Sequence, residues 1–121
     1  NDGSAVVKNN IFSAPGLAHI VCSNPASGII YNYNVYHGTG SVGLIGYNGS
    51  NYTSLADFQN ATVHEDNGRD DDPLFADSAA GNFSLLPGSP CIGAGDNSAG
   101  VTVDFAGNSY KNPPSIGAYE D

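Results

Sequence analysis

Short apolar runs alternate with polar turn residues along this chain, and part of the pattern occurs twice. Residues 7–12 read VKNNIF and residues 31–36 read YNYNVY, so Asn10 matches Asn34 at an offset of 24 residues. Residues 19–22 and 43–46 repeat at the same offset. Repeats of roughly 20–50 residues are typical of solenoids, in which each unit buries its apolar face against the next. The pattern predicts a β-solenoid, because each unit holds two short β-rich runs and no helix.

The runs rich in β-branched and aromatic residues predict the strands, and Gly, Pro, Asn and Ser mark the turns between them. We expect strands over residues 6–12, 18–22, 29–36 and 42–47, and strand signals return at 73–75, 82–86 and 91–92. One segment differs. Ser54 is followed three residues later by Asp57, which resembles a capping box, and Leu55 and Phe58 fall on one helical face. This pattern predicts a small inserted helix over residues 54–60 in an otherwise all-β chain.

Asn10 and Asn34 occupy equivalent positions of the repeat. If the two units stack, these amides lie about 4.7–4.9 Å apart, the spacing of neighbouring strands. Primary amides at that spacing donate and accept along the stack and satisfy polar groups in a narrow interior. A sugar-binding role is the other interpretation. The repeat itself favours a structural ladder.

The composition limits the classes of partner. The chain has 121 residues, enough for one domain, and carries three Lys and Arg against twelve Asp and Glu, a net charge of -9. Such a surface repels nucleic acid and anionic membrane, and no apolar stretch is long enough to span a bilayer. Neutral sugars, cations and basic surfaces remain. Because the chain contains no Met, we expect it to be processed or part of something longer. Cys22 and Cys91 are interpreted as a disulfide or, equally well, as two buried thiols.

The second half of the chain carries a more specific signal in five short segments. In order they are DPLF at 72–75, NFSL at 82–85, PGSPCI at 87–92, DFAGN at 104–108 and IGAYE at 116–120. This order resembles the C-terminal end of right-handed parallel β-helix proteins of the pectate-lyase-like group, many of them extracellular polysaccharide lyases and glycoside hydrolases. The resemblance implies a short right-handed parallel β-helix over residues 1–121 and an extracellular or cell-surface location.

The same resemblance sets the functional expectation. It matches closing coils rather than a catalytic coil, so it implies the C-terminal part of a polysaccharide-active protein that contributes carbohydrate contact or stability without a complete catalytic set. The alternative is a structural or interaction module with no carbohydrate activity. Fold alone does not decide between the two.

No spacing along the chain gathers a catalytic set. An eliminative lyase needs a base and a cation beside a uronate. The candidate groups are Lys8, Arg69, Lys111, His19, His37 and His64, which are scattered along the sequence. A glycoside hydrolase needs two carboxyl groups about 5–10 Å apart. Asp96 and Asp104 are candidates, but Asp in Gly-rich turns ordinarily bonds backbone amides. We therefore do not expect this chain alone to be an enzyme.

Five tyrosines are the candidate carbohydrate-binding residues, because aromatic rings offer stacking platforms for sugars. They are Tyr31, Tyr33, Tyr36, Tyr47 and Tyr52, all within one region of the chain. Tyrosine is also an ordinary residue of strand surfaces. Both interpretations stay open from the sequence.

The acidic segment 66–72 suggests a calcium site, since hard cations prefer clustered carboxylate and carbonyl oxygens. The candidate ligands are Asp66, Asp70, Asp71 and Asp72. An EF-hand loop counted from Asp66 would need a metal ligand at its third position, but this chain has Gly68 there. The segment therefore does not follow the EF-hand pattern. The alternatives are an irregular Ca²⁺ site and a solvated acidic loop, and the solvated loop is the simpler interpretation. No other cofactor is predicted.

The ends of a solenoid need covering, because an open end exposes apolar interior and unpaired strand edges. Only four residues, NDGS, precede the first predicted strand. They leave Val6, Val7, Ile11 and Phe12 in a coil with nothing beneath it. We therefore expect the chain to pair through this first coil as a two-fold homodimer.

Overall fold

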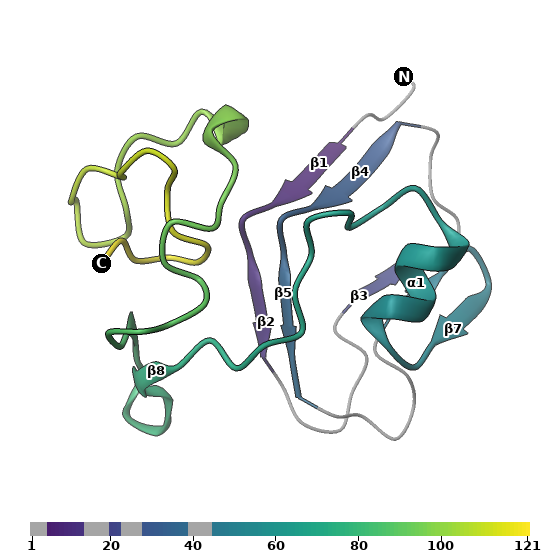
Figure 1. Ribbon diagram of the computed structural model, residues 1–121, viewed down its shortest axis with the longest axis horizontal. Coiled ribbons are helices and arrows are strands. Elements are labelled where there is room, and N and C mark those ends of the chain that lie inside the picture. The colour runs from purple at the N-terminus through teal and green to yellow at the C-terminus, as the bar shows by residue number, and fades with distance from the viewer. Residues whose placement is uncertain (1–4, 14–19, 23–27, 39–44) are drawn as a thin grey trace.

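The computed structural model describes residues 5–13, 20–22, 28–38 and 45–121 (Figure 1). Its strands are β1 (Ala5–Lys8), β2 (Ile11–Ser13), β3 (Ile20–Cys22), β4 (Ile29–Asn32), β5 (Val35–His37), β6 (Ile45–Tyr47), β7 (Ser50–Tyr52), β8 (Phe75–Asp77) and β9 (Asn82–Leu85). The helices are α1 (Leu55–Ala61) and two short 3-10 turns, η1 (Ser78–Ala80) and η2 (Asn97–Ala99). His19 and parts of the predicted strands 18–22 and 42–47 lie outside the described residues.

The two halves of the chain have different architectures. The described residues up to 69, here called the layered region, hold β1–β7 and α1, whereas residues 73–121, the loop region, are mostly turns (Figure 1). The loop region lies beside β1 and β2 in Figure 1. None of the described helices has the length and hydropathy that crossing a membrane requires.

The repeated segments pair with each other as parallel strands. β1 pairs with β4 and β2 with β5, and the partners Val7–Tyr31 and Phe12–Tyr36 keep the 24-residue offset. β3 pairs with β6, but Ile20 lies opposite Ile45, one residue beyond the predicted offset. A one-residue slip moves side chains to the opposite face of a strand, and this register buries Ile45.

The long strands predicted over residues 6–12 and 29–36 are each divided in two. Asn9 and Tyr33 adopt left-handed backbone conformations, with φ of 60° and 58°. Asn tolerates this conformation, whereas a bulky residue such as Tyr rarely adopts it. The resulting bends place β1 and β4 in one sheet and β2 and β5 in another.

The predicted right-handed parallel β-helix is wrong. The described strands are three or four residues long and form four separate sheets of two or three strands, with no closed sheet or solenoid among them. The pairs β6–β7 and β8–β9 are antiparallel. The physical reason is that the repeat occurs only twice, whereas repeat architectures need at least three units to bury a continuous core. The sequence after residue 47 does not continue the repeat.

The short helix was predicted correctly. Ser54 caps α1 through its hydroxyl, which accepts a hydrogen bond from the Asp57 backbone N–H at 3.1 Å. Leu55 and Phe58 point inward and join Tyr36 and Ile45 in a buried cluster. A second cluster, of Val35, Cys91 and Ile116, joins the layered region to the loop region. Burial of these apolar side chains is the main term that holds the helix and the two regions in place.

A column of polar groups runs from the exposed Asn10 to the buried Asn34 and Glu65 of the layered region. The side-chain N–H of Asn10 donates to Asn34 Oδ1 at 3.0 Å, and Asn34 Nδ2 donates to Glu65 Oε1 at 2.6 Å. The Tyr36 hydroxyl also donates to Glu65 Oε1, at 2.6 Å. Glu65 is fully buried, and an added Cβ on Gly68 would lie 2.9 Å from the Glu65 Cβ. The ladder predicted from the repeat thus ends on a carboxylate that the repeat does not contain.

Candidate functional site

Asn9 is the point at which the loop region joins the first pair of strands. Its left-handed backbone turns the side chain toward residue 96, where Nδ2 donates to the Asp96 carbonyl at 2.9 Å and Oδ1 accepts from the Asp96 N–H at 2.8 Å. The Asn9 carbonyl accepts from the Gly117 N–H at 3.0 Å. A side chain at residue 117 would clash, since its Cβ would lie 2.8 Å from Ile11 Cδ1. One residue therefore holds two separate loop segments against β1 and β2.

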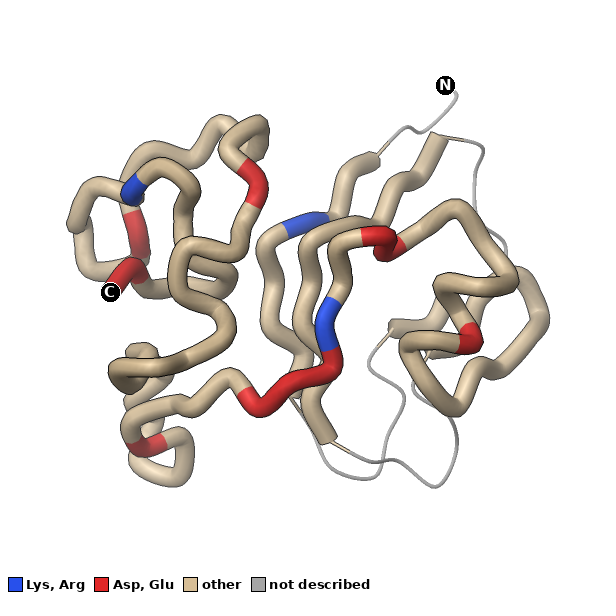
Figure 2. Tube along the Cα trace, viewed as in Figure 1, with Lys and Arg blue, Asp and Glu red and all other residues tan. Residues whose placement is uncertain are grey.

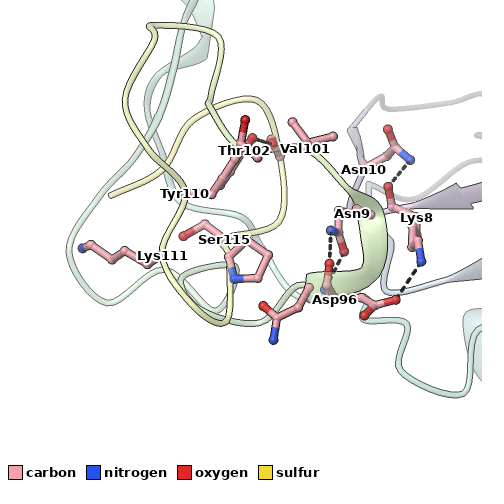
Figure 3. Close-up of a pocket in the computed structure, with 13 residues that line it drawn as sticks. Lys8, Asn9, Asn10, Asp96, Val101, Thr102, Tyr110, Lys111 and Ser115 are labelled. Atoms are coloured by element: carbon pink, nitrogen blue, oxygen red, sulfur yellow. Dashed lines mark hydrogen bonds and ion pairs between the residues drawn. The ribbon is translucent and has the colours of Figure 1, made fainter.

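Two adjoining cavities lie along this junction, and Asn9, Asn10 and Gly117 line both of them. The polar cavity has a volume of about 400 Å³. It is also lined by Lys8, Asp96, Asn97, Ala99, Val101, Thr102, Tyr110, Lys111, Pro114 and Ser115. Figure 3 shows most of these side chains around Asn9 and Asn10.

The second, aromatic cavity also has a volume of about 400 Å³. Three phenylalanines line it, Phe12 on β2, Phe75 on β8 and Phe83 on β9. Phe75 and Phe83 meet edge to face, with ring centroids 5.3 Å apart, and Phe83 is 46% exposed. Phe12 stacks on Tyr36, and this contact with the buried cluster fixes the position of the Phe12 ring. The cavity thus presents preorganised aromatic surface beside amide groups.

Asn10 lies at the junction of the two cavities with its carbonyl oxygen available. Its Nδ2 donates to the Lys8 carbonyl at 2.9 Å and to Asn34 Oδ1 at 3.0 Å. Within the described residues, Asn10 Oδ1 accepts no hydrogen bond from the protein, and the residue is exposed. A ligand hydroxyl that donates to this oxygen would complete its hydrogen bonding.

The charged groups of the polar cavity are already paired. Lys8 Nζ lies 2.8 Å from Asp96 Oδ2 and donates to the Ser98 hydroxyl at 2.7 Å (Figure 3). The bond from Lys8 is the largest cause that lowers the pKa of Asp96 to about 2, and the bonds from Ser98 add to it. Asp96 therefore stays ionised at neutral pH and cannot serve as a general acid there.

The second predicted carboxyl group is also engaged in holding the backbone. Asp104 is buried and accepts from the N–H groups of Asn108 at 2.8 Å and Glu120 at 3.0 Å. Burial raises its pKa, but these bonds together outweigh burial and lower it. Asp96 and Asp104 thus have the turn-stabilising role that their Gly-rich surroundings favour.

The five predicted tyrosines line neither cavity in the described structure. Tyr31 and Tyr36 are buried, and burial raises the pKa of Tyr31 to about 12. The Tyr47 hydroxyl lies 2.8 Å from His64 Nε2, while Tyr33 and Tyr52 are half-buried. Sequence reasoning missed the phenylalanines of the aromatic cavity. Each of these phenylalanines occupies an apolar position in a short strand. Such a position predicts that the side chain is packed, but it does not predict that the side chain lines a cavity.

The predicted calcium ligands follow the edge of the layered region rather than a common centre. Arg69 lies 3.5 Å from Asp71, and Asp72 accepts from the Leu74 N–H at 2.9 Å. Figure 2 shows a run of acidic positions on the segment between the two regions. No three His, Cys, Asp or Glu side chains of the described residues come together in a group that could hold a metal ion. Cys22 and Cys91 are both free thiols.

The comparisons with known proteins add no relative. No protein-family model matches the chain, no curated protein is significantly similar to it, and no solved structure resembles it significantly. Together with the small sheets of mixed orientation, this finding overturns the resemblance to the pectate-lyase-like group. Function must therefore be argued from the cavities themselves.

Proposed function

We propose that this protein binds polysaccharide, and that the polar and aromatic cavities together form the binding site. The observation that carries the proposal is their adjacency: three phenyl rings and the exposed Asn10 amide line one continuous junction. A sugar ring has apolar C–H faces and hydroxyl groups at its edge. The phenyl rings suit the faces, and the Asn10 oxygen suits a hydroxyl.

The dimensions agree with this chemistry. Cavities of about 300–1,000 Å³ that combine apolar walls with a few polar groups are typical small-molecule sites. Each cavity here has a volume of about 400 Å³, and the two share Asn9, Asn10 and Gly117. A site made of two adjoining cavities suits a chain of sugars better than one compact ligand. An extracellular location belongs to the same proposal, because cell-wall polysaccharides, one large class of such ligands, lie outside the cell.

The proposal is for binding without turnover. Asp96 is held by Lys8, and Asp104 is used by backbone N–H groups, so neither is available to protonate a leaving group or activate water. The layered region then serves as a rigid support for the site. A structural or interaction module without carbohydrate affinity is the alternative.

Binding to an array of plant and algal polysaccharides tests the proposal, with Phe83→Ala as the site variant. Removing this ring should weaken binding about tenfold, which corresponds to about 1.4 kcal/mol. Phe105→Ala is the matched control, because Phe105 is also exposed but lines neither cavity. Equal loss in both variants would contradict the site. Absence of binding to every polysaccharide would favour the structural module, and release of unsaturated or reducing-end products would contradict binding without turnover.

A further inference from the structure

Every Lys and Arg of this chain lies beside a carboxylate. Lys8 pairs with Asp96 at 2.8 Å, Lys111 with Asp121 at 2.6 Å, and Arg69 lies 3.5 Å from Asp71. The chain has only these three basic side chains and a net charge of -9. Figure 2 shows them on separate parts of the fold, each near acidic positions. No unpaired Lys or Arg therefore remains to receive an acidic ligand.

The two lysines that line the polar cavity illustrate the point. The Asp96 carboxylate that holds Lys8 is itself fixed, since it accepts from the Ser98 N–H at 3.0 Å and its backbone is bound twice by Asn9. Lys111 extends away from Lys8 toward the far side of the loop region, where it meets Asp121 (Figure 3). An entering anion would therefore meet ammonium groups whose charge a nearby carboxylate already balances.

We infer that the site selects neutral glycans over glycans that carry carboxylate or sulfate groups; this inference rests on the polysaccharide binding proposed above. A uronate or sulfate in the polar cavity would lose water and find no unpaired cation, which is unfavourable for a charged group. Asn10 Oδ1 and Asp96 would face it with further oxygen atoms. The field of the whole chain adds repulsion. Sugar hydroxyls donate to the same oxygens at no such cost.

A pair of ligands with the same backbone and different charge tests the inference. Polygalacturonate and its methyl-esterified form share one backbone and differ in charge, and neutral xylan, β-glucan and galactan extend the series against alginate and sulfated galactan. Neutral glycans should bind at least about tenfold more tightly, and their affinity should not change between low and high salt, because screening acts only on charges. Tighter binding of the acidic forms would overturn the selectivity and leave polysaccharide binding intact. Loss of all glycan binding would instead overturn the proposed function.

Two variants test the electrostatic cause. Asp96→Asn leaves the Lys8 charge unpaired, and Val101→Lys adds a cation at an exposed position that lines the polar cavity. Both should acquire salt-sensitive binding to polygalacturonate, at least about fivefold over the parent chain. Their matched controls are Asp71→Asn, which frees Arg69, a residue that lines neither cavity, and Val103→Lys, an exposed position that lines neither cavity. Val101→Lys keeps the test decisive if Asp96→Asn fails to fold. No gain with Val101→Lys, or an equal gain with Val103→Lys, would overturn the inference.

Discussion

In the layered region the backbone hydrogen bonds run mainly between neighbouring strands, whereas in the loop region side chains satisfy many of them. Asp104, Asp96 and Glu120 each accept from backbone N–H groups, at separations from two to sixteen residues along the chain. A ladder spreads its stability over many weak bonds, but a carboxylate that holds several amides concentrates it in one residue. Substitutions in the core should therefore destabilise the layered region most, whereas loss of a single carboxylate should be enough to destabilise the loop region.

The largest effect should come from the aromatic core of the layered region. Phe58→Ala removes a fully buried ring that packs against Tyr47, Tyr52 and His64. It should lower the free energy of unfolding by about 3–5 kcal/mol, as Phe→Ala changes in cores do. Urea unfolding measures the loss. Val63→Ala, at an 88% exposed position just after α1, is the control and should change stability by less than about 0.5 kcal/mol. Similar values for both would mean that the cluster does not hold α1.

A smaller effect should follow removal of one carboxylate in the loop region. Asp104→Ala leaves the N–H groups of Asn108 and Glu120 without their partner. The expected loss is about 1–3 kcal/mol. Hydrogen exchange should place the increased opening in residues 102–120 while β1–β7 stay protected. Uniform loss of protection over both regions would show that they unfold as one unit and would contradict the division drawn above.

The two regions should also respond to acid over different pH ranges. Burial lowers the pKa of His64 below 6.5, although the Glu65 charge opposes it, so the folded state favours neutral His64. Stability from this group is present above about pH 6.5 and falls as the pH drops toward the lowered pKa. For Asp96, whose pKa falls from 3.8 to about 2, the contribution is present above about pH 4 and disappears as the pH falls toward 2.

Unfolding free energies measured from pH 8 to pH 2 would separate the two contributions. His64→Gln should flatten the upper part of the profile, and Asp96→Asn the lower part. If His64→Gln altered only the range below pH 4, the assignment of the upper range to this residue would be wrong.

The smallest effect concerns self-association. The loop region covers part of the surface that was expected to pair, since Ile11 packs against the cluster of Val35, Cys91 and Ile116. Val6 and Ile30 remain exposed and face each other in register across β1 and β4. A two-fold dimer through this pair should have about twice the 12.4 kDa chain mass in light scattering, and Val6→Lys should shift it toward monomer. A monomer at high concentration would contradict the predicted dimer.

Local patterns predicted local structure well. The repeat indicated that β1 pairs with β4, because equivalent positions of its two copies lie side by side. Ser54 with Asp57 indicated the start of α1, because a helix cap involves neighbouring residues. The fold as a whole was not predictable from two copies of a repeat. The candidate site was missed because it joins residues 8–13 to residues 75–118 through the side chain of Asn9, a contact that leaves no periodic trace in the sequence.

The burial of Tyr31 and Tyr36 was not predictable for a related physical reason. Alternation along a strand indicates that one face is buried, but not which face. The buried Tyr36 hydroxyl has Glu65 as its acceptor, and the Tyr31 backbone N–H donates to His64 Nδ1. His64 and Glu65 follow α1, in a segment that the repeat does not include.

The close contact between Gly68 and Glu65 has a consequence for the evolution of this protein. Any side chain at residue 68 would meet the Glu65 Cβ and carboxylate within 3 Å, and loss of the carboxylate would remove the oxygen that accepts from both the Tyr36 hydroxyl and Asn34 Nδ2. A substitution at only one of these two positions should therefore destabilise the fold. Homologous sequences should therefore keep Glu and Gly three residues apart as a pair, or replace both together, and this linked choice would identify true relatives where overall similarity has faded.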